Sequence, residues 1–168
     1  AGAISVNVIG SATTSIVAGG SMTEVETVTV SAHADSTITA VVLGIAVGVA
    51  LGTGGAAGAL GVAVAVNVIE GIDAALPGAA ASDGQLIVAE MRGTEVTASG
   101  AVNVTATSEQ TITSVVLAAS VAVAATGGFG LSIAGAGAIA VNRGAARVVA
   151  EVTGGAQDVS AGSMRVEA

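Results

Sequence analysis

The stretch Val41-Val42-Leu43-Gly44-Ile45-Ala46-Val47-Gly48-Val49-Ala50-Leu51-Gly52 decides the fold, because large and small side chains alternate along it with a period of two. Every odd position carries a bulky aliphatic side chain, and every even position after Val42 is Gly or Ala. Leu60-Gly61-Val62-Ala63-Val64-Ala65-Val66-Asn67-Val68 follows the same rule, with the bulky residues at even positions. Successive side chains of a β-strand point to opposite faces. Both segments are therefore predicted to be strands with one bulky face and one face of nearly bare backbone.

Neither face of such a strand suits water, so we expect the sheet to be covered on both sides. A single two-stranded hairpin is not stable alone in water. Neighbouring repeats must then supply the covering surface, as they do in solenoid proteins. This pattern indicates a structural role more than a catalytic one.

The chain is internally repetitive, because three short blocks of sequence recur along it. The extra length of the second copy predicts an insertion near residues 77–91, where Pro77-Gly78 and Ser82-Asp83-Gly84 are turn signals. The recurring blocks are Thr37–Leu43 with Thr111–Leu117; Ala3–Asn7 with Ala63–Asn67 and Ala138–Asn142; and Val28–Ala32 with Val102–Ala106 and Met164–Ala168.

These repeats predict one repetitive β-domain over residues 1–168. It comprises a partial repeat at 1–35, a full repeat at 36–109 and a partial repeat at 110–168. Gly-rich turns are expected to join two apolar hairpins, 38–52 with 59–69 and 112–125 with 129–142, since tight turns need positive φ. The sequence opens on a return strand, and no basic stretch followed by an apolar run is visible there that would predict a signal peptide. We therefore expect a window from a longer array, or open ends that complete a neighbouring subunit.

The predicted fold class is all-β, either a repetitive β-solenoid or a stacked β-hairpin fibre with long apolar strands. Asn7, Asn67 and Asn142 recur where each return strand ends, and Asn tolerates left-handed backbone there. The side chains expected to carry packing and assembly are Val41, Leu43, Gly44, Ile45, Val47, Gly48, Val49, Leu51, Val62, Val64, Val66, Val115, Leu117, Val121, Val123, Phe129, Leu131, Ile133, Ile139 and Val141.

Composition excludes several classes of function. The chain has a formal net charge of −8, four Arg and no Lys, so it could not neutralise a run of phosphates in a nucleic acid. It has no Cys, which excludes disulfide and thiolate chemistry. It also has no Trp or Tyr, so its core must be built from Val, Ile, Ala and Gly, as suits thin and closely spaced layers.

Transmembrane helices are the main rival interpretation. No charged residue lies between Asp35 and Glu70 or between Glu109 and Arg143, and each interval is long enough to span a bilayer. A period of two, however, places no coherent face on a helix of 3.6 residues per turn. No cluster of Lys and Arg and no belt of Trp and Tyr flanks either interval. We therefore expect strands and no membrane partner.

Few residues suggest chemistry. His33 and Asp35 would share a face of a strand and could act in acid–base catalysis or bind a metal, but a solvated strand edge is the simpler interpretation. The run Gly52–Gly58 lacks the helix and the spacing of a nucleotide-binding loop, and without Lys no phosphate-binding P-loop is possible. Asn103-Val104-Thr105 matches a glycosylation sequon at chance level. We expect no enzymatic activity.

Two sets of polar residues remain as candidate ligand sites. The acidic set could supply oxygen ligands to Ca²⁺ but lacks any calcium-binding motif, so a solvated rim that deters aggregation is favoured, with no cofactor. The Thr and Ser rows could bind a surface glycan, although such rows commonly serve as β-structure ladders. The acidic set is Glu70, Asp73, Asp83, Glu90 and Glu95, and the rows are Thr27, Thr29, Ser31, Thr37, Thr39, Thr105, Thr107, Thr111 and Thr113.

An apolar Ala/Val/Gly hairpin, then Ala-Val-Asn, then a polar strand such as Val28-Thr29-Val30-Ser31-Ala32 resembles the repeats of large bacterial surface adhesins. These are the filamentous-haemagglutinin-like and leukotoxin-like proteins. The resemblance covers nearly the whole chain and implies an exported, elongated β-structure at the cell surface or outside the cell. We therefore expect a non-enzymatic structural repeat of a fibre, stalk or filament, whose partners are neighbouring repeats or identical subunits. The alternatives are an adhesin repeat that binds a surface glycan through its Thr and Ser strands, and a membrane protein with Gly-rich helices.

Overall fold

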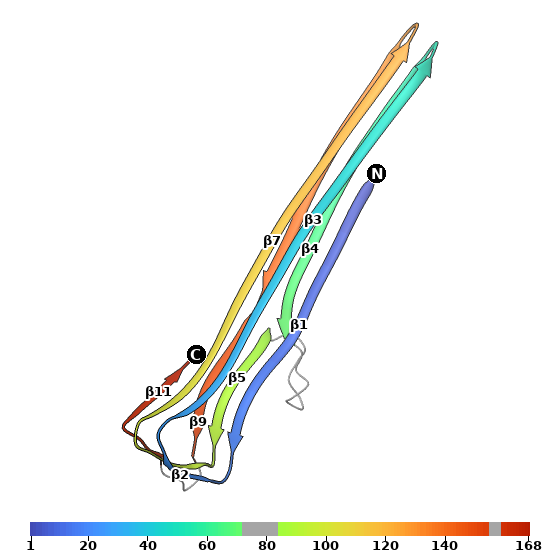
Figure 1. Cartoon of the computed structure of the whole chain (residues 1–168). Helices are drawn as coiled ribbons and strands as arrows, with labels where there is room; N and C mark the ends of the chain where they lie inside the picture. Colours follow the sequence, from blue (N-terminus) through green and yellow to red (C-terminus); the bar gives the residue numbers. More distant parts are fainter. Residues whose placement is uncertain (72–83, 155–158) are drawn as a thin grey trace. The chain divides into compact units, whose positions relative to one another are not determined.

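The computed structural model describes residues 1–71, 84–154 and 159–168, and this part of the chain is all-β, with strands joined by short turns and no helix (Figure 1). The long period-two segments are strands, as predicted. The strands are β1 (Gly2–Ala18), β2 (Ser21–Val25), β3 (Val28–Gly52), β4 (Gly55–Gly71), β5 (Gln85–Arg92), β6 (Glu95–Ala98), β7 (Ala101–Thr126), β8 (Gly130–Gly144), β9 (Ala146–Thr153), β10 (Val159–Ser160) and β11 (Ser163–Glu167).

The strands form three sheets in which corresponding strands of successive repeats lie side by side. The orders are β8-β4-β1-β5-β9, β10-β6-β2 and β11-β7-β3. The pairing is parallel: β1 pairs with β5 from Ala12↔Leu86 to Ala18↔Arg92, and β5 pairs with β9 from Gln85↔Ala146 to Arg92↔Thr153. Each repeat thus finds its hydrogen-bonding partner in the next copy of the same strand.

The register agrees with the sequence repeats. The predicted equivalence of Val102–Ala106 with Met164–Ala168 is confirmed, because β7 and β11 pair through Met164↔Val102 and Val166↔Val104. Of the segment expected to be an insertion, residues 77–83 lie outside the described residues. The remainder contains all of β5 except Arg92, and β5 pairs with its counterparts β1 and β9, so this part of the predicted insertion is wrong.

The predicted hairpins are wrong in one respect. β3 and β4 are joined by a short Gly-containing turn, yet they lie in different sheets, and the same holds for β7 and β8. Each pair is therefore an arch between two layers, and its two strands do not share a hydrogen-bonded ladder. The physical reason is that each strand already has a partner of matching sequence in the next repeat, which satisfies its backbone.

The described residues divide into two units, and β1, β3, β4, β7 and β8 contribute residues to both. The first unit contains Ala1–Val8, Thr37–Val68 and Thr111–Arg143. The second contains Ile9–Ser36, Ile69–Gln110 and Gly144–Ala168.

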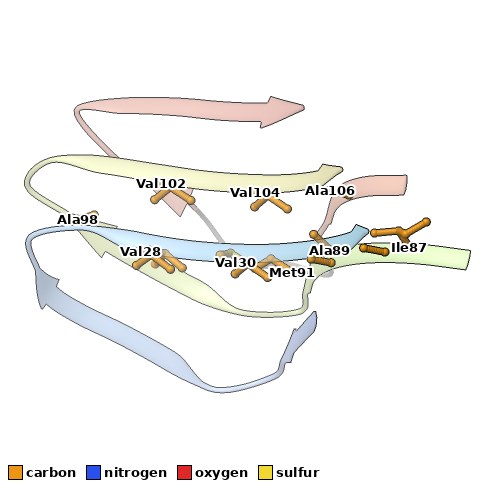
Figure 2. Packing of buried hydrophobic residues seen from close by; sticks show 12 residues of the cluster. Val28, Val30, Ile87, Ala89, Met91, Ala98, Val102, Val104 and Ala106 are labelled. Atoms are coloured by element: carbon orange, nitrogen blue, oxygen red, sulfur yellow. The ribbon is translucent and has the colours of Figure 1, made fainter. Parts of the chain in front are cut away.

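The second unit holds the larger apolar core. Its buried side chains come from all three sheets and include Met91 of β5, Val96 of β6 and Val104 of β7. Figure 2 shows Val28 and Val30 on β3 beside the adjacent strand β7, with their side chains directed into the same interior. Small and medium side chains fill this core, as the lack of Trp and Tyr predicted.

Sharp turns in the second unit depend on glycine and repeat from one copy to the next. Gly19 and Gly93 have φ of 70° and 56°, in the left-handed region that favours glycine. The Gly19 amide donates to the carbonyl of Arg92 at 2.9 Å, and the Gly93 amide donates to the carbonyl of Thr153 at 2.9 Å. Hydrogen bonds between successive copies therefore continue through the turns.

Candidate functional site

The small faces of β3 and β4 form the interior of the first unit. Gly44, Ala46, Ala63 and Ala65 are all buried there. A Cβ placed on Gly44 would lie 2.8 Å from the carbonyl carbon of Val62 and 3.3 Å from the Cβ of Ala63, and still closer to the carbonyl oxygen of Val62. The two layers therefore approach too closely for any side chain at this position.

Two other glycines mark the same close approach. A Cβ on Gly48 would lie 2.9 Å from the carbonyl carbon of Gly58, and one on Gly61 would lie 3.1 Å from that of Ala119. Real Cβ contacts essentially never fall under 3.0 Å, and even 3.1 Å is tighter than nine in ten of them. The predicted packing positions Gly44 and Gly48 thus lie where the backbones of the two layers meet.

The bulky side chains of β3 and β7 point the other way, out of the first unit. We call these exposed side chains the bulky face. Their exposed fractions range from 45% at Val115 to 77% at Leu51. The bulky face consists of Val41, Leu43, Ile45, Val47, Val49 and Leu51 of β3 with Val115, Leu117, Val121 and Val123 of β7.

The other layer of the first unit also exposes aliphatic side chains. Val62, Val64 and Val66 of β4 are half-buried. The side chains of β8 and of the turn before it are exposed, namely Phe129, Leu131, Ile133, Ile139 and Val141. The sequence predicts that both faces of the apolar strands are covered. Within the described residues the small faces of β3 and β4 are covered, whereas both faces of β8 are largely exposed.

Asn7, Asn67 and Asn142 form a hydrogen-bonded ladder across β1, β4 and β8. Asn7 Nδ2 donates to Asn67 Oδ1 at 2.8 Å, and Asn67 Nδ2 donates to Asn142 Oδ1 at 2.8 Å. Asn67 is completely buried. Among the described residues only Glu24, apart from glycines, has positive φ, so the three asparagines do not serve through left-handed backbone. Their recurrence is explained by side-chain pairing between repeats, as in the Asn ladders of stacked β-structures.

Sequence reasoning missed Gln85, which is 1% exposed and organises a polar network in the second unit. Its Nε2 donates to Ser11 Oγ and, at 2.8 Å, to Ser36 Oγ. Its Oε1 accepts from Ser108 Oγ and from Gln110 Nε2, both at 3.2 Å. A buried amide whose oxygen and nitrogen are both bonded fixes the alignment of the strands around it. The available signal was a single uncharged polar residue directly before the apolar run Leu86-Ile87-Val88.

The candidate acid–base pair lies on a strand surface in the second unit. His33 and Asp35 lie on the exposed side of β3, and His33 Nδ1 is 2.7 Å from Thr107 Oγ1 of β7. This contact joins equivalent positions 74 residues apart in successive repeats. In the described part of the chain, the hydrogen-bonding partner of the imidazole is thus a hydroxyl of the neighbouring strand.

The acidic residues are dispersed. Asp73 and Asp83 lie outside the described residues, and no group of three or more potential metal ligands occurs among the residues that the structure describes. Glu90 and Arg92 form an ion pair at 3.6 Å on β5 and line a groove of about 250 Å³ in the second unit. Glu90 and Glu151 are register partners on β5 and β9, so Arg92 offsets a repulsion between like charges.

The remaining candidates are placed as follows. Gly52–Gly58 contains the end of β3, the turn and the start of β4, and no helix follows it. Of the Thr and Ser rows, Thr29, Ser31, Thr37 and Thr39 of β3 are exposed, as are the hydroxyl residues Thr107, Thr111 and Thr113 of β7. Thr105 and Asn103 are half-buried.

The segments that suggested membrane helices are strands, and within the ranges that the structure covers no helix is long and apolar enough to cross a bilayer. The arrangement as a whole offers two kinds of surface: backbone edges of stacked parallel sheets and aliphatic faces. Comparison with other proteins adds nothing to this description, because no family model matches the chain and no match was found among curated proteins or solved structures.

Proposed function

We propose that this chain is a non-enzymatic structural repeat of an extracellular fibre, stalk or filament, in which repeats stack as a β-solenoid or a closely related parallel fibre. The observation that carries the proposal is the parallel register between copies of the same strand. β1, β5 and β9 stack without a break from Ala12, Leu86 and Arg147 onward. Each strand pairs with the corresponding strand of the next repeat, and the last repeat presents the same kind of strand edge. A further repeat or an identical subunit can therefore pair there in the same geometry.

The edges of the sheets support this proposal. β8 and β9 are the outermost strands of the five-stranded sheet, and β3 and β11 are those of the sheet that contains β7. A strand at a sheet edge has one row of N–H and C=O groups directed away from its single neighbour, and this row is a template for another strand. The Asn ladder supplies a second, side-chain template, because Asn142 Nδ2 can donate onward as Asn67 Nδ2 does.

The extracellular location and the kind of assembly are supported by the resemblance of the sequence repeats to those of large bacterial surface adhesins. The dispersed titratable residues support a role without catalysis. The proposed partners are neighbouring repeats or second copies of the chain.

Electron microscopy and X-ray fibre diffraction of the purified 168-residue chain test this proposal. We expect elongated particles and a reflection at about 4.7–4.9 Å along their axis, which is the spacing of hydrogen-bonded strands. Discrete particles at all concentrations, with no axial order, would overturn it. The matched variant is Asn142→Leu, which removes the outer donor of the ladder and should shorten the particles.

A second candidate is an adhesin that binds a glycan. One observation favours it: Thr37 and Thr39 of β3 and Thr111 and Thr113 of β7 are exposed on adjacent strands and could present a flat array of hydroxyls. Saturable binding of the natural chain to immobilised glycans would support this candidate if the double variant Thr37→Val/Thr111→Val loses it and the control Thr29→Val keeps it. Equal binding by the natural chain, the double variant and the control would exclude it.

A further inference from the structure

We propose that the bulky face of β3 and β7 is a docking surface for a second copy of this chain, packed face to face with its own bulky face. The proposed function requires only stacking along sheet edges. This inference adds lateral association, through a different surface and by a different kind of contact.

The size of the bulky face supports a stable contact. The exposed fractions of its side chains include 72% at Val41, 69% at Val47 and 77% at Leu51. Ten half-exposed aliphatic side chains present an area comparable to the roughly 800 Å² that each partner contributes to a standard protein interface. Contiguous apolar patches above a few hundred Å² on a water-exposed surface mark sites of association.

The chemistry of the bulky face suits a copy of itself. Its side chains stand at every second residue of β3 and, except at Ala119, of the neighbouring strand β7, so two such faces can interdigitate in a dry interface like that of a steric zipper. Apart from the N-terminal amine, Arg143 is the only charged group in the first unit. The acidic residues that give the chain its net charge of −8 therefore all lie outside this unit, and like charges are not placed on the contacting face.

Lipid is the other apolar partner to consider, and three observations disfavour it. The chain has no Trp or Tyr to anchor at a membrane interface and no Lys to flank a spanning segment. Its net charge is negative, which does not attract an anionic membrane surface. Sheets with open edges such as β3 and β8 do not occur within hydrocarbon, because their backbone groups would lack hydrogen-bond partners there.

Cysteine cross-linking tests the contact directly, since the natural chain contains no cysteine. Val41→Cys, Ile45→Cys and Val49→Cys place single thiols along the bulky face. Ser31→Cys is the matched control, because it lies on the exposed side of the same strand outside the apolar row. We expect disulfide-linked dimers from at least one of the three variants and none from Ser31→Cys. Edge-to-edge stacking predicts no difference in cross-linking among the four positions. Equal cross-linking of all four variants would therefore overturn the lateral contact and would not contradict the proposed stacking.

A charge substitution gives an independent measurement. Val47→Lys places an ammonium group in the proposed dry interface, whereas Thr29→Lys places the same charge on the polar part of β3. Both side chains are exposed, so both variants should fold, as far-ultraviolet circular dichroism can verify. In sedimentation velocity we expect Val47→Lys to weaken self-association at least tenfold relative to Thr29→Lys.

Two results would overturn the inference. One is self-association of Val47→Lys equal to that of Thr29→Lys. The other is a natural chain that stays monomeric in solution but floats with phosphatidylcholine vesicles, which would assign the bulky face to lipid. Loss of filament order along the axis with intact cross-linking would instead count against the proposed function alone.

Discussion

Replacing Gly44 by alanine tests whether the two layers of the first unit lie so close together that no side chain fits between them at this position. The added Cβ would lie 2.8 Å from the carbonyl carbon of Val62, whereas ordinary van der Waals contact begins at 3.4 Å. The facing strand must therefore retreat by 3.4 − 2.8 = 0.6 Å, or more to clear the carbonyl oxygen. The neighbouring atom is backbone, so no side-chain rotation can relieve the contact.

The matched control is Gly58→Ala, because no described atom lies within 4 Å of a Cβ built at Gly58 and its φ is not positive. Alanine at an unstrained glycine position raises stability by about 0.4–1 kcal/mol through the unfolded chain. Both variants receive this gain, and only Gly44→Ala incurs overpacking, at a cost of about 1–3 kcal/mol. We therefore expect Gly44→Ala to be less stable than Gly58→Ala by about 1–3 kcal/mol.

Urea unfolding followed by far-ultraviolet circular dichroism measures this difference, since a chain without Trp or Tyr offers little intrinsic fluorescence. Gly61→Ala, whose Cβ would approach the backbone carbonyl oxygen of Ala119 as closely as that of Gly44→Ala approaches Val62, should also be less stable than Gly58→Ala. A Gly44→Ala protein as stable as Gly58→Ala would refute the close approach of the layers.

Five further substitutions probe the polar contacts. Asn67→Ala should lower the free energy of unfolding by about 1–3 kcal/mol, because it removes both hydrogen bonds of the ladder. Asn142→Ala, at the exposed end of the ladder, removes one of them and should cost less in the same urea titration. Gln85→Ala should cost at least about 2 kcal/mol, since it removes four hydrogen bonds, and Gln110→Ala should cost about half as much in thermal unfolding. Arg92→Ala breaks a partly exposed ion pair and should change stability by under about 1 kcal/mol, an effect that should vanish in 1 M salt.

Each of these expectations has a contrary outcome. Equal losses at the two asparagines would mean that burial does not set the strength of the ladder. An unchanged melting temperature of Gln85→Ala would mean that the polar network around Gln85 does not stabilise the alignment of the strands. A large, salt-independent loss at Arg92 would indicate that its aliphatic stem, and not its charge, matters.

The period-two pattern was sufficient to predict the extended strands and the sides on which their residues lie. Val41 to Leu51 and Leu60 to Val68 are in strands, and their side chains alternate as expected. The recurrence of Val-x-Val blocks also identified partners such as Val102 and Met164. These features follow from local geometry and from repetition, which sequence records directly.

The pattern could not tell a hairpin from an arch, because alternation shows which face a side chain occupies and not which strand its backbone bonds. A short Gly-rich turn such as Thr53-Gly54 is compatible with both. Gln85 was missed for a related reason: its four partners come from positions between 23 and 74 residues away, and only the fold brings them together. The role of the asparagines required the same three-dimensional information, although their recurrence was visible.

The asparagine ladder has a consequence for how such chains change length. Successive asparagines are 60 and then 75 residues apart, yet both links measure 2.8 Å. Fifteen additional residues (75 − 60) are thus accommodated between two rungs without a slip, although a one-residue shift would turn every side chain of a strand to the opposite face. New sequence can therefore be inserted between β4 and β5, in evolution or by protein engineering. Sequence searches for related chains should score the recurring asparagines and allow the number of residues between them to vary.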